Sequence, residues 1–166
     1  MKSSTPLILS TLNARYMHTA FGLRYLYANL GNLQQHAKII EFTIQELPIN
    51  IAERLLSEQP NIIGFSVYIW NVAEVTKTVA MIKQISPEVK IILGGPEVSH
   101  YPDVPAVAEL ADYVISGQGE AALPELCQQL LAGETPEQKY IEAKPLPLEQ
   151  LVLPYQYYDD EDIRNR

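Results

Sequence analysis

The chain has 166 residues, 47% of them hydrophobic and 19% charged, with a formal net charge of −8. This length and apolar content suffice for the core of one domain, while an acidic chain without a Lys/Arg cluster argues against nucleic acid or an anionic membrane surface as partner. No apolar run approaches the roughly 20 residues that span a bilayer, and the lone cysteine, Cys127, excludes a disulfide framework and favours a cytoplasmic location.

Five short apolar runs, each followed by a helical pattern, predict alternating strands and helices. The strands are expected over residues 7–11, 37–42, 61–67, 89–93 and 112–116. The helices are expected over residues 19–30, 50–57, 72–82, 104–110 and 120–131. Asn50 and Asn71 are the expected N-caps of two helices, and Gly31 and Gly133 follow the ends of two others.

Single helices between strands must cross over the sheet, so the strands run parallel with right-handed connections. Five such units predict an α/β, doubly wound, flavodoxin-like (Rossmann-like) sheet with strand order 2-1-3-4-5, over residues 6–133. Beyond this point Pro145, Pro147 and Pro154 interrupt any regular element. We therefore expect residues 134–166 to form a linker toward a further domain, or a flexible tail.

The loops that follow the expected strands contain glycines and aromatic residues. They lie at the carboxyl edge of the sheet, where open α/β sheets bind ligands. The strand before Gly94-Gly95-Pro96 stops where the glycines remove every Cβ and the proline fixes the turn. Free backbone amides there favour phosphate or amide groups, and flat apolar surface comes from Tyr16, Tyr68, Trp70 and Tyr101. The pattern predicts a large, flat ligand with a phosphate-bearing tail, although a tight structural turn without a ligand explains Gly94-Gly95-Pro96 equally well.

Other sites of this fold class match the sequence poorly. A response-regulator receiver needs acidic residues where Ser10-Thr11 and Ser66-Val67 end their strands. A dinucleotide site needs a Gly-x-Gly-x-x-Gly loop after the first strand, yet the first glycine there is Gly22. An FMN site needs a Ser/Thr-rich phosphate loop, which Ser10-Thr11 matches in part. A flavodoxin-like module that binds FMN, another nucleotide or a partner protein remains the alternative.

Several segments together carry a resemblance to a known family. They are Leu12–Thr19, Leu23–Ala28, Ser66–Asn71, Gly94–Glu97 and Gly117–Glu120. In their order and placement at successive strand ends, they resemble the cobalamin-binding domain of cobalamin-dependent radical S-adenosylmethionine (SAM) enzymes. The resemblance covers about residues 6–133.

The resemblance implies that the corrin ring of cobalamin lies over the carboxyl edge and that its nucleotide tail passes between the strands. The glycine turns would line the tail channel, so that Gly95→Val would block the tail while leaving the fold largely intact. Glu120 would accept a hydrogen bond from the tail, or would simply favour the helix dipole. The residues expected at the cofactor are Asn13, Tyr16, His18, Thr19, Ser66, Tyr68, Trp70, Asn71, Gly94, Gly95, Pro96, Glu97, Gly117, Gly119 and Glu120.

The first loop departs from the Asp-x-His-x-x-Gly pattern of methionine-synthase-like cobalamin domains, in which the histidine ligates cobalt. Here Tyr16 replaces the aspartate that would orient the His18 imidazole, and Gly22 comes one residue late. We therefore expect His18 not to hold cobalt in that manner and predict no metal ligand in the chain. A hydrogen bond from His18 to the corrin edge is an alternative, as is a plain position at the start of the helix.

The family's catalytic half holds a 4Fe-4S cluster on three closely spaced cysteines, and this chain has Cys127 alone, at a packing position of a helix. The resemblance implies an N-terminal cobalamin domain whose radical SAM barrel, with SAM and the cluster, follows in cis beyond the linker. The chain itself is expected to bind and present cobalamin for methyl transfer or related chemistry, and to catalyse nothing on its own.

Overall fold

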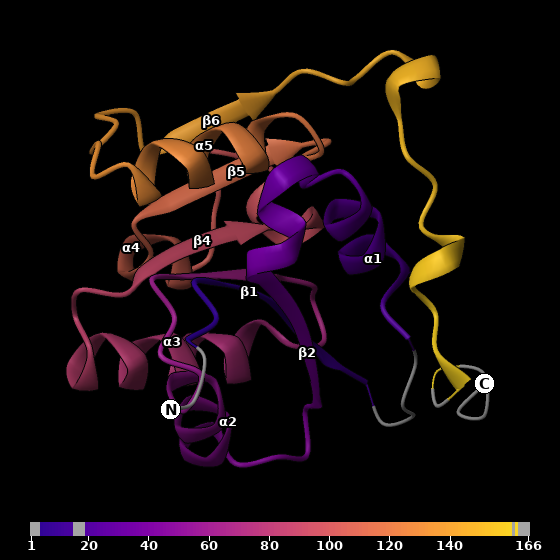
Figure 1. Ribbon diagram of the computed structural model, residues 1–166. Helices are drawn as coiled ribbons and strands as arrows, with labels where there is room; N and C mark the ends of the chain where they lie inside the picture. Colours follow the sequence, from indigo (N-terminus) through magenta and orange to yellow (C-terminus); the bar gives the residue numbers. More distant parts are fainter. Residues whose placement is uncertain (1–3, 15–18, 161, 163–166) are drawn as a thin grey trace.

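A six-stranded parallel sheet forms the centre of the molecule in the computed structural model, which describes residues 4–14, 19–160 and 162. The strands are β1 (Leu7–Asn13), β2 (Ala37–Thr43), β3 (Ile62–Ser66), β4 (Lys90–Gly94), β5 (Tyr113–Gly117) and β6 (Tyr140–Ala143). Their order is β2-β1-β3-β4-β5-β6, and every neighbouring pair is parallel (Figure 1). The predicted parallel, flavodoxin-like sheet is confirmed, and so is the order of its first five strands.

The predicted number of five strands is wrong, because β6 extends the sheet at the β5 edge. Its four residues pair with β5 from Val114↔Tyr140 to Gly117↔Ala143. A run this short has no readable period, and the strand is held by backbone pairing and by the Tyr113 hydroxyl, which donates to the Pro136 carbonyl at 3.0 Å. Pro145 follows closely and has no N–H to donate to a strand ladder, which is consistent with the end of β6 at Ala143.

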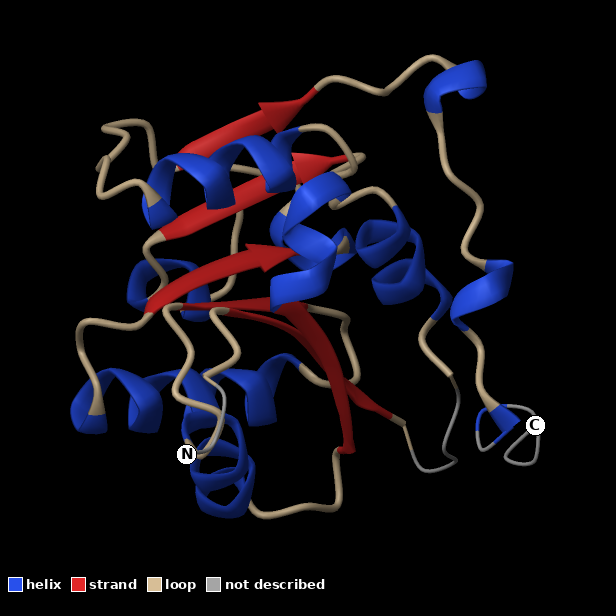
Figure 2. Ribbon diagram, viewed as in Figure 1, coloured by secondary structure: helices blue, strands red, loops and turns tan. Residues whose placement is uncertain are grey.

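Helices cover both faces of the sheet, as in a doubly wound fold (Figure 2). Helices α1 (Phe21–Ala28) and α5 (Ala122–Leu131), with the 3₁₀ helix η1 (Gly31–His36), pack on one face. Helices α2 (Pro48–Leu56), α3 (Val72–Ile85) and α4 (Val107–Leu110) pack on the other. Short 3₁₀ helices form at Pro96–Val98, Leu148–Gln150 and Tyr155–Tyr157. No helix in the described part of the chain combines the length and hydropathy that crossing a membrane requires.

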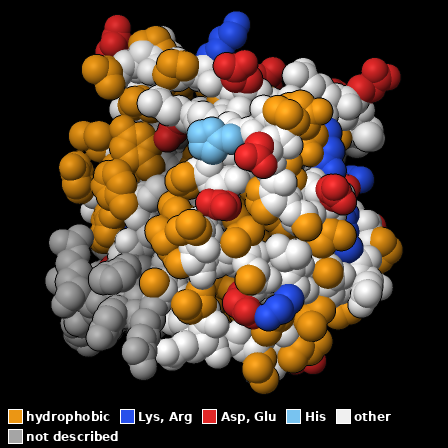
Figure 3. All heavy atoms as spheres, turned by 180° about the vertical axis from the view of Figure 1, so that it is seen from behind, with side chains coloured by type: hydrophobic (Ala, Val, Ile, Leu, Met, Phe, Trp, Pro, Cys, Tyr) orange, Lys and Arg blue, Asp and Glu red, His pale blue; other side chains and the backbone are white. Residues whose placement is uncertain are grey.

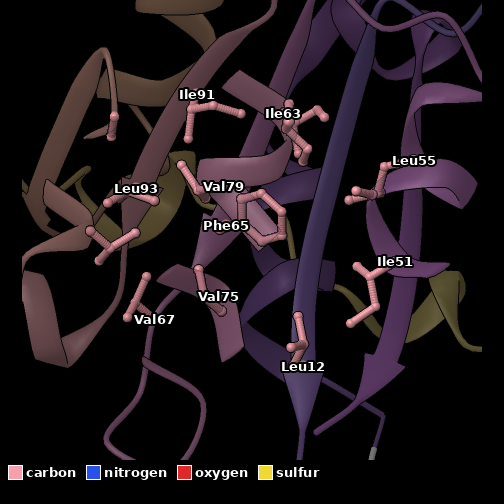
Figure 4. Packing of buried hydrophobic residues seen from close by; sticks show 14 of the residues in the cluster. Leu12, Ile51, Leu55, Ile63, Phe65, Val67, Val75, Val79, Ile91 and Leu93 are labelled. Atoms are coloured by element: carbon pink, nitrogen blue, oxygen red, sulfur yellow. The ribbon is translucent and has the colours of Figure 1, made fainter. Parts of the chain in front are cut away.

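Side-chain alternation along the inner strands produces two separate cores. On β3, Ile63 and Phe65 point toward α2 and α3, where Figure 4 shows Phe65 among Val75 and Val79. Ile62, on the opposite face, joins the core beneath α1 and α5. Strands buried on both faces read as continuous apolar runs, which explains why β1, β3 and β4 were predictable.

Two local expectations at helix ends have different outcomes. Asn50 is not an N-cap, because α2 begins two residues earlier with Leu47 as its cap and Pro48 in the first turn. A proline at the first helical position has the φ that a helix needs and lacks only an N–H that would be unpaired there. Gly133 is confirmed as the residue that ends α5, with φ at 84°.

The C-terminal part of the described chain runs back across α1 (Figure 1). The backbone of Val152 and the side-chain amide of Asn29 exchange two hydrogen bonds, both 3.0 Å long. Further along, the Tyr157 ring lies edge-on against Tyr27, with 5.2 Å between the ring centroids. This stretch therefore contacts the α1 region at Val152 and at Tyr157.

Candidate functional site

The carboxyl ends of β1, β3, β4 and β5 are neighbours, as the sequence predicts. At this edge Ser66 pairs with Thr11 on one side and with Gly94 on the other. The loops that follow β3, β4 and β5 therefore meet, and they carry the predicted aromatic and glycine residues. Figure 3 shows hydrophobic side chains gathered on the side of the molecule toward which the strands point in Figure 1.

Small residues on the α1/α5 face of the sheet open a slot at this edge. Gly64 and Ser66 on β3, Gly94 on β4 and Gly117 on β5 leave space where larger side chains would fill the interface. The resulting cavity has a volume of about 70 Å³. Its apolar walls are Leu9, Leu23, Leu26, Ile92, Ile115 and Leu123. We call this cavity the slot; it is smaller than pockets that enclose whole drug-sized ligands, which measure about 300–1,000 Å³, and therefore suits one part of a larger ligand.

Gly64 forms the floor of the slot, and the sequence analysis missed it. It stands in the middle of β3, between Leu9 on β1 and Ile92 on β4. A Cβ at this position would lie 3.2 Å from the Leu9 Cδ2 atom. A lone glycine inside an apolar strand indicates that something approaches the backbone closely, and this signal was present in the sequence.

Gly95 plays a different part from the one predicted. Its φ is 103°, and a Cβ would lie 2.5 Å from the carbonyl oxygen and 2.8 Å from the nitrogen of Val67. The two loops are also joined by hydrogen bonds, since the Val67 N–H donates to the Gly94 carbonyl at 2.8 Å. The expectation that Gly95→Val would spare the fold is therefore wrong, because any side chain here would collide with backbone. Pro96, exposed, and Glu97, half-buried, continue the turn as a 3₁₀ helix.

The turn after β5 forms the opposite lip of the slot. Gly117 has φ at 81°, and a Cβ on Gly119 would lie 3.2 Å from the Leu26 Cδ2 atom of α1. Glycine at position 119 thus lets α1 approach the turn. The next residue, Glu120, has a buried Oε2 atom with no hydrogen-bond partner among the described residues. A buried unpaired acceptor one residue from a slot-lining glycine is a reason to look for a donor on a ligand.

Asn71 is fully buried beneath the β3 loop rather than at its surface. Its Oδ1 accepts a hydrogen bond from the Tyr68 N–H at 2.9 Å, and its Nδ2 donates to the Leu12 and Ser66 carbonyls at 3.0 and 3.2 Å. The side chain therefore joins β1, β3 and the loop. It holds Tyr68 and Trp70 in place, whose rings stack with 4.4 Å between centroids and 7° between planes.

The start of α1 is tied to β2 and to Asp162 by a buried cation that the sequence analysis did not single out. The Arg24 guanidinium lies between the Glu41 carboxylate of β2 at 2.9 Å and the Asp162 carboxylate at 2.7 Å. Burial alone would lower the pKa of Arg24, but the two carboxylates outweigh it and raise the pKa above its usual value.

The remaining predicted residues of the loop after β1 fall into two groups. Asn13 donates to the Glu41 carboxylate at 3.2 Å, and Thr19 donates to Asp162 at 3.3 Å. Both therefore contact the Arg24 ion-pair network rather than the slot. Tyr16 and His18 lie outside the described residues. Within the described ranges, no group of three or more His, Cys, Asp and Glu side chains is placed to hold a metal ion.

A family model and two curated relatives match this chain. The model described as B12 binding domain matches residues 9–127. The 2-(S-pantetheinyl)-carbapenam-3-carboxylate methyltransferase of Streptantibioticus cattleyicolor is 30% identical over 93 residues, which are 54% of this chain and 12% of that protein. The cobalamin-dependent radical SAM methyltransferase TokK of Streptomyces tokunonensis is 31% identical over 87 residues, 50% of this chain and 12% of that protein. The chain thus covers about an eighth of the length of either relative.

Several solved structures share the fold. A cobalamin-binding protein from Desulfitobacterium hafniense matches 75% of this chain and 58% of its own, with TM-score 0.51 and 18% identity. The methanol:cobalamin methyltransferase complex MtaBC from Methanosarcina barkeri matches 80% of this chain and 49% of its own, with TM-score 0.57 and 12% identity. The response regulator RcsB from Salmonella typhimurium matches 80% and 66%, with TM-score 0.53 and 13% identity. Sequence identities this low show a shared fold only, so the function has to be argued from the site.

Proposed function

This chain belongs to the B12-binding domain family, and we propose that it holds cobalamin with the corrin ring over the carboxyl edge of the sheet and the nucleotide tail in the slot. The observation that carries the proposal is the slot itself, floored by Gly64 and opening between Ser66, Gly94 and Gly117. No tight turn requires a glycine in the middle of β3. A structural turn would not account for a glycine at this position, where the missing Cβ opens the floor of the slot.

The residues at the slot fit the parts of such a cofactor. Apolar walls suit the flat aromatic base at the end of the tail. At the mouth, the Ser66 hydroxyl offers a polar contact to the ribose and its substituents. Glu120 follows Gly119, which lines the slot, and its unpaired Oε2 atom offers a further contact to the tail. Tyr68 and Trp70, stacked and partly exposed at the edge, offer a flat surface to one side of the corrin ring.

The protein supplies binding and orientation, and the cofactor supplies a cobalt–carbon bond that can be made and broken for methyl transfer. Asn71 fixes the β3 loop from below, and Gly95 lets the β4 loop lie against the Val67 backbone. These two contacts set the shape of the edge on which the ring would rest. In this arrangement no side chain of the described residues needs to transfer a proton.

We further propose that the domain presents cobalamin to a radical SAM methyltransferase domain in cis, which would carry SAM and the 4Fe-4S cluster. The support is the name of the Streptomyces tokunonensis relative and the small share of its length that this chain covers. The substrate and the methylated atom belong to that other domain. The cobalamin-binding unit, predicted to end at residue 133, is proposed to extend through β6 at Ala143, because β6 pairs with β5 in the same sheet.

A titration of the chain with hydroxocobalamin, followed by absorbance and by gel filtration, tests the function. The proposal predicts saturable binding at one cofactor per chain and a corrin spectrum that elutes with the protein. FMN, titrated in parallel, is expected not to bind, because Ser10 and Thr11, the partial match to a phosphate loop, are buried in β1 and donate to the Ile40 and Ser66 carbonyls. Binding of FMN without binding of cobalamin would overturn the proposal in favour of a flavodoxin-like module.

A further inference from the structure

The interior of the slot offers no hydrogen-bonding side chain. Beyond Ser66 and the glycines, the residues that line it are Leu9, Leu23, Leu26, Ile92, Ile115 and Leu123, with Phe65 and Leu93, which belong to the core on the other face of the sheet. Ser66 is the last residue of β3 and stands at the mouth, one step along the same face from Gly64. Every polar side chain assigned to the slot is thus at its opening, and the depth is lined by hydrocarbon.

The backbone of the slot floor is equally unavailable. Gly64 pairs with Leu9 on β1 and with Ile92 on β4, so its strand has hydrogen-bonded neighbours on both sides. In a parallel ladder of this kind the N–H and C=O groups point within the sheet toward those neighbours. A ligand lying on the face of the sheet therefore finds no free donor or acceptor beneath it.

Building on the proposed function, we infer that the slot selects among cobamides by the chemistry of the base that ends the tail. It accepts bases with an apolar surface, such as 5,6-dimethylbenzimidazole or a cresol, and discriminates against adenine. The exocyclic amine and additional ring nitrogens of adenine lose their bonds to water in the slot and gain no partner there. One buried unpaired polar group weakens binding by roughly a factor of ten or more.

Four corrinoids that share the same ring separate the contributions of ring and base. They are cobalamin, the cresol-based cobamide, the adenine-based cobamide, and cobinamide, which has no base. Their dissociation constants, measured by absorbance titration, should place cobalamin and the cresol-based cobamide together and the adenine-based cobamide at least about tenfold weaker. Adenine coordinates cobalt less strongly than dimethylbenzimidazole. If affinity depended only on how easily the base leaves cobalt, the adenine-based cobamide would therefore bind more tightly than cobalamin.

The outcomes distinguish a failure of this inference from a failure of the proposed function. If the adenine-based cobamide binds as tightly as cobalamin, the selectivity is refuted and cobalamin binding stands. If all four bind equally, cobinamide included, the slot does not hold the tail and the inference falls with it. If none binds, the proposed function itself is wrong.

Two variants, Leu26→Gln and Leu130→Gln, test which side of the slot contacts the base. Leu26 is half-buried on α1 and lines the slot, whereas Leu130 is half-buried on α5 and does not. Leu26→Gln places an amide against the base and should narrow the difference between cobalamin and the adenine-based cobamide by several-fold. Leu130→Gln should leave the difference unchanged. An unaltered difference in Leu26→Gln would contradict the placement of the base against α1.

Discussion

Gly64→Val tests the slot with little disturbance of the fold. A Cβ at Gly64 meets only the Leu9 Cδ2 atom at 3.2 Å, the flexible end of a side chain, with the next atoms at 3.9 Å and beyond. Valine is favoured in strands, and its methyl groups would extend into the slot rather than into packed core. We expect the free energy of unfolding to stay within about 1 kcal/mol of the parent, which corresponds to a Tm shift of about 2–4 °C for a domain of this size.

The expected loss of cobalamin affinity follows from the area that the base buries. An aromatic group of the size of a large side chain buries about 150–250 Å². At about 25 cal/mol per Å² this is worth roughly 4–6 kcal/mol before the costs of ordering. A third of that amount, about 1.4 kcal/mol, already corresponds to a tenfold change in Kd. Gly64→Val should therefore weaken cobalamin binding at least tenfold and leave the weaker binding of cobinamide almost unchanged.

Absorbance titrations of cobalamin and cobinamide, with thermal melts of each variant, provide the measurement. Gly31→Ala is a control for a glycine substitution outside the slot, because a Cβ at Gly31 meets open space; its φ of 57°, a strain that Gly64 does not share, should lower Tm without changing cobalamin binding. Gly95→Val should instead lower both Tm and cobalamin binding, since its Cβ collides with the Val67 backbone. A folded Gly64→Val protein with the parent's Kd for cobalamin would refute the assignment of the slot.

Three further predictions concern buried polar groups. Asn71→Leu removes the side chain that donates to the Leu12 carbonyl and accepts from the Tyr68 N–H, so urea unfolding should show a loss of about 2–4 kcal/mol in the free energy of unfolding, and a loss below about 1 kcal/mol would contradict its joining role. Burial alone would raise the pKa of Asp162, but the Asp159 N–H and Arg24 outweigh burial and lower the pKa. The stability that the ionised Asp162 contributes is therefore present above its unfolded pKa of about 4 and is lost as pH falls through its folded pKa. Asp162→Asn should therefore flatten the fall in stability between pH 7 and pH 3, whereas equal falls in parent and variant would exclude the ion pair as its source. Burial raises the pKa of the Cys127 thiol to about 12, so a thiol reagent at pH 8 should react after denaturation and not before, and rapid labelling of the native chain would contradict the packing.

The sheet was largely predictable because its inner strands are buried on both faces. β1, β3 and β4 read as apolar runs bounded by turn residues, and the helices between them impose parallel pairing. β6 was missed because its four residues carry no period and depend on pairing with β5. An edge strand of this kind is specified by a neighbour that is distant in the sequence.

The site was predictable where its chemistry is local and unpredictable where it depends on tertiary pairing. The turn at Gly94-Gly95-Pro96 is encoded by its own residues, and its place at the carboxyl edge follows from the fold. The buried contacts of Asn71 could not be foreseen, because its partner Leu12 is 59 residues away, and Arg24 meets Asp162 across 138 residues. Gly64 is the exception, since its isolated position in an apolar strand already indicated close approach to the backbone.

The slot's role is tested most directly by methyl NMR of the chain, with leucine and isoleucine methyl groups labelled, during titration with diamagnetic cobalamin. The account predicts ring-current shifts at Leu9, Leu26 and Ile115, which line the slot, and none at Ile51 and Leu55 in the opposite core (Figure 4). Cobinamide, which lacks the base, should leave the slot methyl groups nearly unshifted. Binding of cobalamin with no change at the slot methyl groups would contradict the claim that the nucleotide tail enters between the sheet and α1.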